Sequence, residues 1–159
     1  MTTKNTNLVA NFEATPQVAN SASELAGVLR TAHGSVELAA GDSTDNDIVM
    51  LAPIPSNAAV PNIFVGSDTF GGSCTFNVGI YQADGTVKDE DVFATSVADA
   101  AALTDVRYEA ADLNTGSKKL WELAGDSEDP GGYFYIAITF NATGGTAGTL
   151  NWNINYVVN

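Results

Sequence analysis

Basic residues and cysteines are both scarce in this chain of 159 residues. Six lysines and arginines stand against 19 aspartates and glutamates, so the formal net charge is −13. A surface with this charge repels phosphate backbones and anionic lipid headgroups, so neither a nucleic acid nor a membrane is expected as a partner. The one cysteine, Cys74, has no second cysteine to pair with, so the fold must be stable without an internal disulfide.

Long apolar runs are also missing from the sequence. No segment is long enough to be a signal peptide or to span a bilayer, and we therefore expect synthesis in a reducing cytosol. The composition that remains, with 45% apolar and 16% charged residues, is typical of a globular protein. A chain of this length suits one domain that buries about 68–70% of its unfolded surface.

Alternation of apolar and other residues predicts the main strands. In the segment 133–140 every second residue from Phe134 is large and apolar, and in the segment 150–158 every second residue from Leu150 is apolar while asparagines fill most of the other places. A strand with one strongly apolar face needs a second layer to cover that face. We therefore predict an all-β, antiparallel β-sandwich.

A short helix is expected just before the strand at 133–140. Ser117 can cap it, Leu120 and Leu123 fall on one face, and Gly125 supplies the left-handed residue that ends a helix. The segment 126–132 after it is rich in acidic and turn-forming residues.

The remaining strands are expected at shorter and less regular segments. The segment 26–40 is predicted as one strand or as two strands broken near His33 and Gly34. The other expected strands, about eight in all with those above, lie at 48–54, 60–65, 74–80, 92–97 and 105–110.

Residues 1–25 are predicted to form an extended N-terminal arm, and residues 26–159 the sandwich domain. The arm is dominated by Asn, Thr, Ser and Gln, with the isolated apolar residues Leu8, Val9 and Phe12. Two interpretations stay open: a frayed terminus, or a strap laid on a neighbouring subunit with these three side chains as anchors.

Residues capable of acid–base or nucleophilic catalysis are few. The one histidine, His33, stands beside a glycine and is interpreted as a turn residue, and Cys74 shares the apolar face of its strand and is interpreted as a core residue. Carboxylate pairs such as Glu90 with Glu122 or Glu128 could serve a glycosidase, but none stands in an apolar setting that would raise a pKa. We predict that the protein is not an enzyme and has no catalytic residues.

Acidic residues cluster in three predicted loops, at 42–47, 89–91 and 126–129. Calcium prefers several loop oxygens, but no cluster has the glycine and glutamate spacing of the twelve-residue calcium loop. We interpret the clusters as solvated turns, and we expect neither a metal nor a cofactor.

Three segments resemble structural proteins of tailed bacteriophages and cyanophages. They are IVMLAPIPSNAAVPNIFVGSD at 48–68, FNVGIYQADGTVKDEDVFATSV at 76–97 and KKLWELAGDSEDPGGYFYIAITF at 118–140. The proteins they resemble are capsid decoration, or cement, proteins: jelly-roll-like subunits, often trimeric, that are clamped on the outer face of the head. The resemblance covers about residues 26–158 and rests on structural turns.

This resemblance implies a non-enzymatic virion protein on the capsid exterior, made in the host cytoplasm, with the major capsid protein and two further copies of itself as partners. Leu8, Val9 and Phe12 are then the expected contacts to capsid or neighbour, and Trp121, Tyr133 and Tyr135 further interface candidates, since aromatic residues are enriched at interfaces. The alternative is a receptor- or glycan-binding module of a tail fibre, or a secreted carbohydrate-binding domain. That alternative would use the same three aromatic residues in a row, with calcium in an acidic loop.

Overall fold

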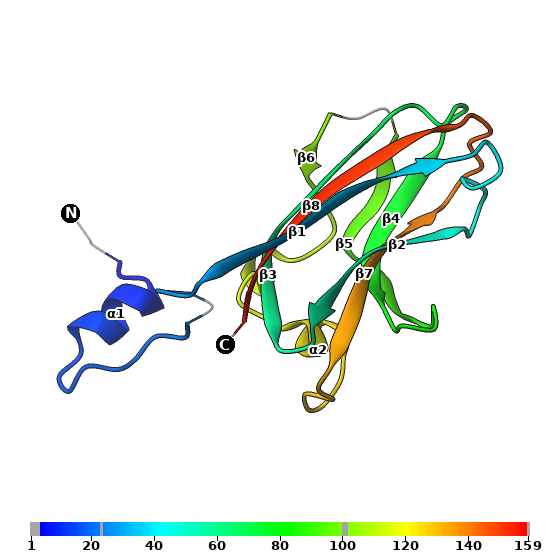
Figure 1. Ribbon diagram of the computed structural model, residues 1–159. Coiled ribbons are helices and arrows are strands. Elements are labelled where there is room, and N and C mark those ends of the chain that lie inside the picture. Colours follow the sequence, from blue (N-terminus) through cyan, green and yellow to red (C-terminus); the bar gives the residue numbers. More distant parts are fainter. Residues whose placement is uncertain (1–3, 23, 100–101, 159) are drawn as a thin grey trace.

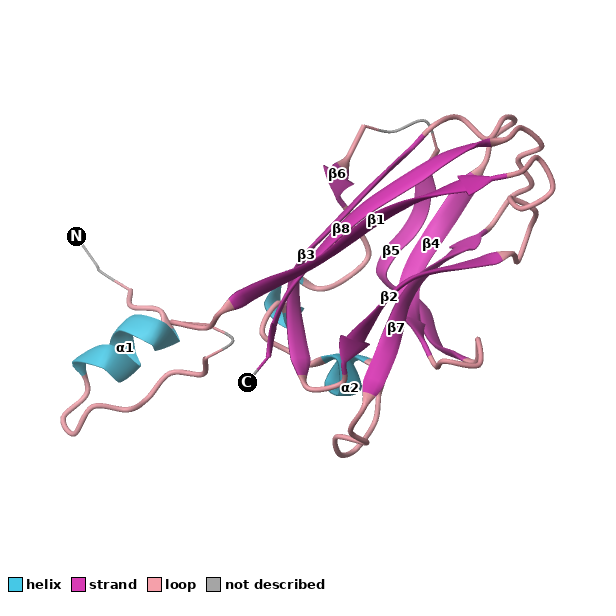
Figure 2. Ribbon diagram, in the orientation of Figure 1, coloured by secondary structure: helices cyan, strands magenta, loops and turns pink. Residues whose placement is uncertain are grey.

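The computed structural model describes residues 4–22, 24–99 and 102–158. In these residues eight strands form two four-stranded antiparallel sheets that are stacked to form a β-sandwich (Figure 1). The strands are β1 (Leu29–Leu38), β2 (Ile48–Pro55), β3 (Ala58–Ser67), β4 (Thr75–Tyr81), β5 (Val87–Ala98), β6 (Thr104–Asp105), β7 (Tyr133–Phe140) and β8 (Gly148–Val158). Three short helical elements, α1 (Asn7–Glu13), η1 (Leu113–Thr115) and α2 (Leu120–Leu123), complete the described secondary structure (Figure 2). None of the helices in the described residues is long and apolar enough to cross a membrane.

The strand order is that of a jelly roll. One sheet has the order β1-β8-β3-β6 and the other β2-β7-β4-β5, so consecutive strands change sheet except at β4 and β5. The first strand pairs with the last, the second with the seventh, the third with the sixth and the fourth with the fifth. This is the pattern of a long hairpin rolled up on itself, and it confirms the predicted all-β sandwich.

The core lies between the sheets and is built largely from the alternating strands. The side chains of Ile136, Ile138 and Phe140 on β7, and of Leu150 and Ile154 on β8, are fully buried. The ring of Phe140 meets two other phenylalanine rings edge to face, with centroids 5.5 and 6.1 Å apart, a geometry that aromatic quadrupoles favour. The inward faces predicted for these two strands are therefore confirmed.

The outer face of the second sheet is covered as well, because β5 bulges over β4. The pairing register jumps between Ile80 with Asp89 and Val78 with Ala94, so the six residues 89–94 of β5 lie opposite only the three residues 78–80 of β4. A Cβ atom on Gly79 would lie 2.2 Å from the carbonyl oxygen of Asp89. Only a glycine lets the two backbones approach so closely. The bulge explains why Tyr81, on the outward face of β4, is fully buried.

A buried arginine holds the corner between β6 and η1. Arg107 is fully buried, and its guanidinium lies 4.8 Å from the ring centroids of both Phe93 and Tyr108. Its Nε donates to the carbonyl oxygen of Val60 at 2.7 Å, and its Nη2 donates to the carbonyl oxygen of Thr115 at 3.1 Å. Burial lowers the pKa of Arg107, while nearby Tyr108 and Asp105 raise it. The side chain thus joins β3, β5 and the 106–116 segment.

Several expected boundaries differ from the structure. The strand predicted in 26–40 is one unbroken strand, so His33 lies in mid-strand and not in a turn. The predicted helix is α2 and Gly125 follows it at φ +78°, but its N-cap is Lys119 rather than Ser117, with the Lys119 amide donating to Glu122 Oε2 at 2.7 Å. The segment predicted as a strand at 105–110 is strand only at Thr104–Asp105.

The N-terminal segment stands away from the sandwich as an arm (Figure 1). It is not extended throughout, because residues Asn7–Glu13 form α1. We define the arm as the described residues before β1, which are residues 4–22 and 24–28.

Candidate interaction surfaces

The arm is a small hook held together by polar contacts. The Asn11 side-chain amide donates to the Asn20 side-chain oxygen at 2.8 Å, and Asn20 donates to the carbonyl oxygen of Leu8 at 3.1 Å. The amide of Val18 donates to the carbonyl oxygen of Asn11 at 3.1 Å. No residue of α1 is buried, so this hook has no apolar core of its own.

Large apolar side chains of the arm point to solvent. Phe12 is 65% exposed and Val28 is 73% exposed. Of the eleven large hydrophobic side chains exposed in the described residues, six lie between residues 9 and 29: Val9, Phe12, Val18, Leu25, Val28 and Leu29. Exposed apolar groups gathered in one segment make the arm a candidate surface for contact with another molecule.

The anchors predicted from the sequence divide between the two sides of α1. Val9 and Phe12 are three residues apart, which places them on one side of the helix, and both are exposed. Leu8 is half-buried, on the side where Asn11 bonds to Asn20. Leu8 is therefore partly covered, while Val9 and Phe12 are exposed to solvent.

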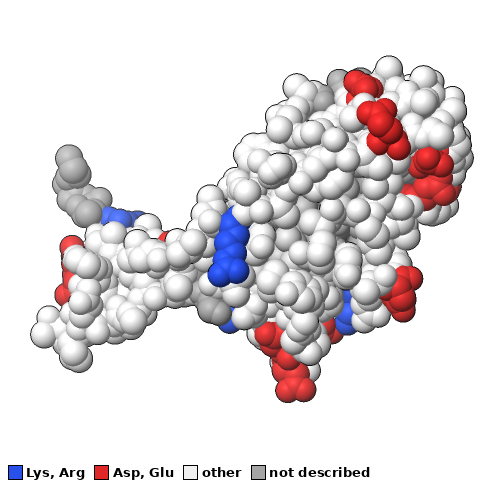
Figure 3. All heavy atoms as spheres, in the orientation of Figure 1, with Lys and Arg blue, Asp and Glu red and all other residues white. Residues whose placement is uncertain are grey.

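The side of the sandwich that carries β1 is nearly free of charge. Figure 3 is white along most of the course that β1 follows in Figure 1, with basic atoms near its start and acidic atoms near its end. The outward residues of β1 pair with Asn151, Asn153 and Asn155 of β8, and the Thr31 hydroxyl donates to Asn153 Oδ1 at 2.9 Å. In a chain with a net charge of −13, this polar but uncharged surface is distinctive.

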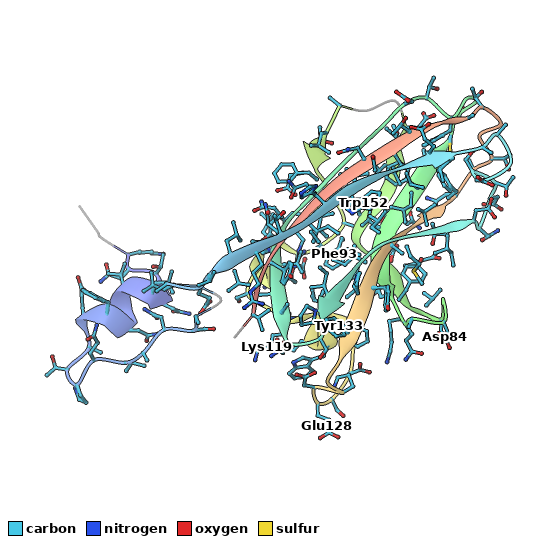
Figure 4. All side chains as sticks on the ribbon, viewed as in Figure 1. Asp84, Phe93, Lys119, Glu128, Tyr133 and Trp152 are labelled. Atoms are coloured by element: carbon cyan, nitrogen blue, oxygen red, sulfur yellow. The ribbon has the colours of Figure 1, made fainter. Side chains whose placement is uncertain are left out.

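A hollow of about 460 Å³ lies beside the loop that joins α2 to β7. Lys88 Nζ forms a salt bridge with Asp126 at 2.8 Å and lies 5.8 Å from the centroid of the Phe134 ring, and Tyr133 forms part of the wall. Figure 4 shows Glu128 at the tip of this loop, with Tyr133 above it on β7. The polar groups and one exposed tyrosine could contact a small polar ligand.

The same loop is stiffened by Asp129. Its Oδ1 accepts hydrogen bonds from the Ser56 hydroxyl at 2.6 Å and from the Gly131 amide at 2.9 Å. The first of these bonds and then the second lower the pKa of the Asp129 carboxyl. The acidic corner at 126–129 is thus a built turn attached to the β2–β3 connection.

The three aromatic residues predicted at an interface are not alike in the structure. Tyr133 is 64% exposed, whereas Tyr135, on the same outward side of β7, is half-buried. Trp121 is half-buried on α2 and packs against the core, while its amide donates to the carbonyl oxygen of Ser56 at 3.1 Å. Only Tyr133 of the three is freely exposed.

The residues with catalytic potential lie in different sheets and environments. His33 is exposed in mid-β1, where Asn153 is its partner in register. Cys74 is buried just before β4, and its thiol donates to the carbonyl oxygen of Ala142 at 3.3 Å. Burial, and then the charge of Asp99, raise the pKa of the Cys74 thiol. A buried thiol with a raised pKa is a poor nucleophile.

The acidic loops mostly bind their own backbone. Asp42 accepts a hydrogen bond from the Ala39 amide at 2.9 Å, and Asp47 accepts one from the Thr44 amide at 2.8 Å. Within the described ranges no three His, Cys, Asp or Glu side chains are grouped closely enough to hold a metal ion. These carboxylates act as turn caps.

Sequence reasoning did not single out Arg107, Gly79 or the edge of β1. A lone arginine in an acidic chain is a weak signal, and the bulge over Gly79 depends on a register that the sequence does not show.

No family model matches the chain, and no curated protein matches it. Among solved structures, it is similar to a chain of the cyanophage Pam1 capsid asymmetric unit, with 18% identity and a TM-score of 0.44 over 84% of this chain and 86% of that chain. It is also similar to a chain of the acidic stable capsid structure of Helicobacter pylori bacteriophage KHP30, with 14% identity and a TM-score of 0.36 over 82% of this chain and 94% of that chain. Both of these solved structures are phage capsid structures.

Proposed function

We propose that this chain is a non-enzymatic structural protein of a phage virion. In this proposal it is a decoration, or cement, protein that is made in the host cytoplasm, binds the major capsid protein on the outer surface of the head, and stabilises the head as a homotrimer. The three sequence segments that resemble such proteins support this role, and so do the arm and the charge of the chain.

The observation that carries the proposal is the exposed arm. Val9 and Phe12 present apolar surface that the chain does not cover itself, on a hook whose shape is already set by hydrogen bonds. Because the hook is already folded, binding loses less conformational entropy than the ordering of a flexible tail, which costs about 1–2 kcal/mol per residue. An anchor of this kind suits attachment to a neighbouring protein surface.

The charge of the chain favours the outside of a head. A subunit with a net charge of −13 is repelled by the packaged genome, so it does not compete for the nucleic acid. An acidic exterior also keeps particles apart in solution.

Stabilisation by such a protein follows from mass action. A ligand that binds only the assembled shell adds RT ln(1 + [L]/Kd) per site, or about 2.7 kcal/mol when its free concentration is 100 times Kd. Linking three chains in one trimer converts weak single contacts into strong combined binding through effective concentration. A trimer with three hooks would therefore hold the shell better than its single contacts suggest.

The test is to add the purified protein back to heads that have been stripped of it. We expect wild-type protein to bind and to raise the temperature at which the heads release their DNA. The variant Val9→Ser/Phe12→Ser should bind at least tenfold more weakly. The matched control Leu113→Ser/Val87→Ser also removes two exposed apolar side chains, but outside the arm, and should bind like wild type.

Two results would contradict the proposal. One is that wild-type protein neither binds the stripped heads nor protects them from heat. The other is that the arm variant and its control lose binding equally, which would remove the arm as the anchor. The trimer is checked separately by light scattering, where we expect three times the chain mass of 16.5 kDa.

One observation favours a second candidate, binding of a glycan by a tail-fibre or secreted module. The hollow beside Tyr133 combines an exposed aromatic ring with the polar groups of Lys88 and Asp126, which are the kinds of groups that contact sugars. A glycan array with and without a calcium chelator separates the two candidates. The decoration role predicts no signal in either condition, and binding that Tyr133→Ala abolishes would favour the glycan role.

A further inference from the structure

Three of the four sheet edges are protected against pairing with another strand. The edge strand β2 contains Pro53 and Pro55 and a register shift between Met50 and Ala52. The edge strand β5 has three register shifts against β4, and the edge strand β6 is only two residues long. Prolines, bulges and short strands are the devices by which proteins prevent edge-to-edge association.

The fourth edge, along β1, has none of these devices. β1 is ten residues long, contains no proline, and keeps an unbroken register with β8 from Leu29 to Leu38. Its only ionisable side chains are those of Arg30, His33 and Glu37. An edge of this length without protection presents a row of backbone donors and acceptors to any strand that approaches it.

We propose that the edge of β1 pairs in antiparallel fashion with β1 of a second copy of this chain. The two sheets β1-β8-β3-β6 would then form one continuous eight-stranded sheet around a twofold axis. Such a contact is isologous, so the same strand serves both partners and the contact closes on itself.

The pairing geometry leaves two registers near the centre of the strand. A twofold axis perpendicular to the sheet keeps each side chain on its own face, so residues of the same face must pair. The axis then passes at His33 or at Gly34. Around these positions the inward residues are Ala32 and Gly34 and an outward neighbour is Ser35, which are small enough to let two strands approach.

The charges of β1 favour a second β1 in this orientation. Arg30 lies near one end of the strand and Glu37 near the other. Antiparallel pairing keeps the two Arg30 residues at opposite ends of the contact, and likewise the two Glu37 residues, so the like charges are separated. Arg30 and Glu37 themselves alternate onto opposite faces and do not pair with each other. Parallel pairing would stack arginine on arginine and glutamate on glutamate, which is unfavourable.

The charge of the whole molecule also selects this side. Two copies with a net charge of −13 each repel one another, so they can approach closely only where acidic groups are sparse. Figure 3 shows few acidic atoms along the middle of β1, and Glu37 near its end is the one acidic residue of that strand. Pairing there would also cover the half-buried side chains of Val36 and Trp152 beside the edge.

This contact extends the proposed function, on which its place in the virion rests. Trimers on a closed shell are related to their neighbours by twofold axes, so β1 pairing would link adjacent trimers into a net over the head. The pairing itself is a property of the purified chain and does not depend on the shell.

Disulfide trapping tests the geometry directly. In either register the two His33 side chains lie about 5–8 Å apart on one face, as directly opposite or diagonal neighbours do. The two Glu37 residues are six or eight positions apart along the strands, which is about 20–26 Å. We expect His33→Cys to form covalent dimers rapidly under a mild oxidant, at protein concentrations where Glu37→Cys and the wild type, with its buried Cys74, form few.

Lysines on the edge provide the second measurement. The variant His33→Lys/Ser35→Lys adds two exposed charges per copy at the centre of the contact, so like charges would face each other across the paired strands. We expect sedimentation equilibrium to show a dissociation constant for the pairing that is at least about tenfold higher. The control Asn151→Lys/Thr104→Lys adds the same charge to exposed positions of the same sheet, on β8 one strand in from the β1 edge and on β6 at the opposite edge, and should leave pairing unchanged.

Two outcomes would overturn the inference. Equal trapping of His33→Cys and Glu37→Cys would show random collision, and loss of association in the Asn151→Lys/Thr104→Lys control would show contact through the sheet face. Head binding is measured separately. If the protein protects stripped heads but His33→Cys forms no covalent dimers, the decoration role is supported and the β1 contact is refuted. If His33→Cys forms covalent dimers but the protein does not bind heads, the β1 contact is supported and the decoration role is refuted.

Discussion

Replacing Gly79 by alanine tests whether β5 lies over β4 as the structure shows. The new Cβ would lie 2.2 Å from the carbonyl oxygen of Asp89 and 2.3 and 2.5 Å from the carbonyl carbon and Cα of Glu90. All three are backbone atoms, so no side-chain rotation can relieve the contact. The strand β5 would have to move away from the sheet, or the sheet would have to bend.

The expected cost follows from these distances. Overpacking of a well-packed site typically costs about 1–3 kcal/mol, and a contact to backbone belongs at the upper end, so we expect a loss of about 3 kcal/mol in the free energy of unfolding. With a urea dependence of about 1.5 kcal/mol per molar, this lowers the unfolding midpoint by about 2 M. Movement of the bulge would also expose Tyr81, which is fully buried in the wild type.

The assay is urea unfolding followed by circular dichroism and tyrosine fluorescence. Gly41→Ala is the matched control, because a Cβ at Gly41 meets nothing within 4 Å and its backbone does not have a positive φ. That control should unfold at the wild-type midpoint or slightly above it. If Gly79→Ala and Gly41→Ala unfold at the same urea concentration, β5 does not cover Gly79 and the argument is refuted.

Three further predictions concern buried or turn residues. Arg107→Ala should lower the free energy of unfolding by about 3 kcal/mol in the same assay, since it leaves a cavity and removes the donor that the Val60 carbonyl oxygen binds. Arg107→Lys should not restore this stability, because one ammonium cannot reach both the Val60 and the Thr115 carbonyl oxygens. A loss below about 1 kcal/mol would contradict the burial. Cys74 should react with a thiol reagent only at the rate of unfolding, and fast labelling in native buffer would show that the thiol is accessible. Because folding lowers the pKa of Asp129, this carboxyl stabilises the fold above its ordinary pKa of 3.8, and the contribution is lost as the pH falls through the lowered value. Asp129→Asn should therefore be less stable than wild type at pH 7, and the difference in stability should narrow in acid. A difference that stays constant with pH would contradict this.

Strands with strict alternation could be predicted from the sequence because burial of one face leaves a period of two. β7 and β8 show this, and their inward residues are the core residues of the structure. The helix α2 could be predicted because Gly125 stops it locally. The predicted N-cap, Ser117, lies two residues before the observed one, Lys119, because the helix begins where the Glu122 side chain accepts a backbone amide.

Features that depend on contacts between distant segments were missed. Arg107 carries no sequence signal of burial, because its acceptors, Val60 and Thr115, come from β3 and η1. Of the interface residues predicted from the sequence, Val9 and Phe12 are exposed, Leu8 is half-buried, and Trp121 packs against the core. The contacts made by any of these residues with a capsid or a neighbour stay a prediction.

The sequence alone determined the class of this protein: an acidic, disulfide-free, two-layer β-structure with a polar arm, since charge, cysteine count and hydrophobic period are local properties of the chain. The tertiary structure decided the jelly-roll order, the bulge of β5 over Gly79, and which sheet edge stays unprotected. These depend on which distant strands pair and in which register, and the energy of that choice is spread over the whole core rather than written in any one segment.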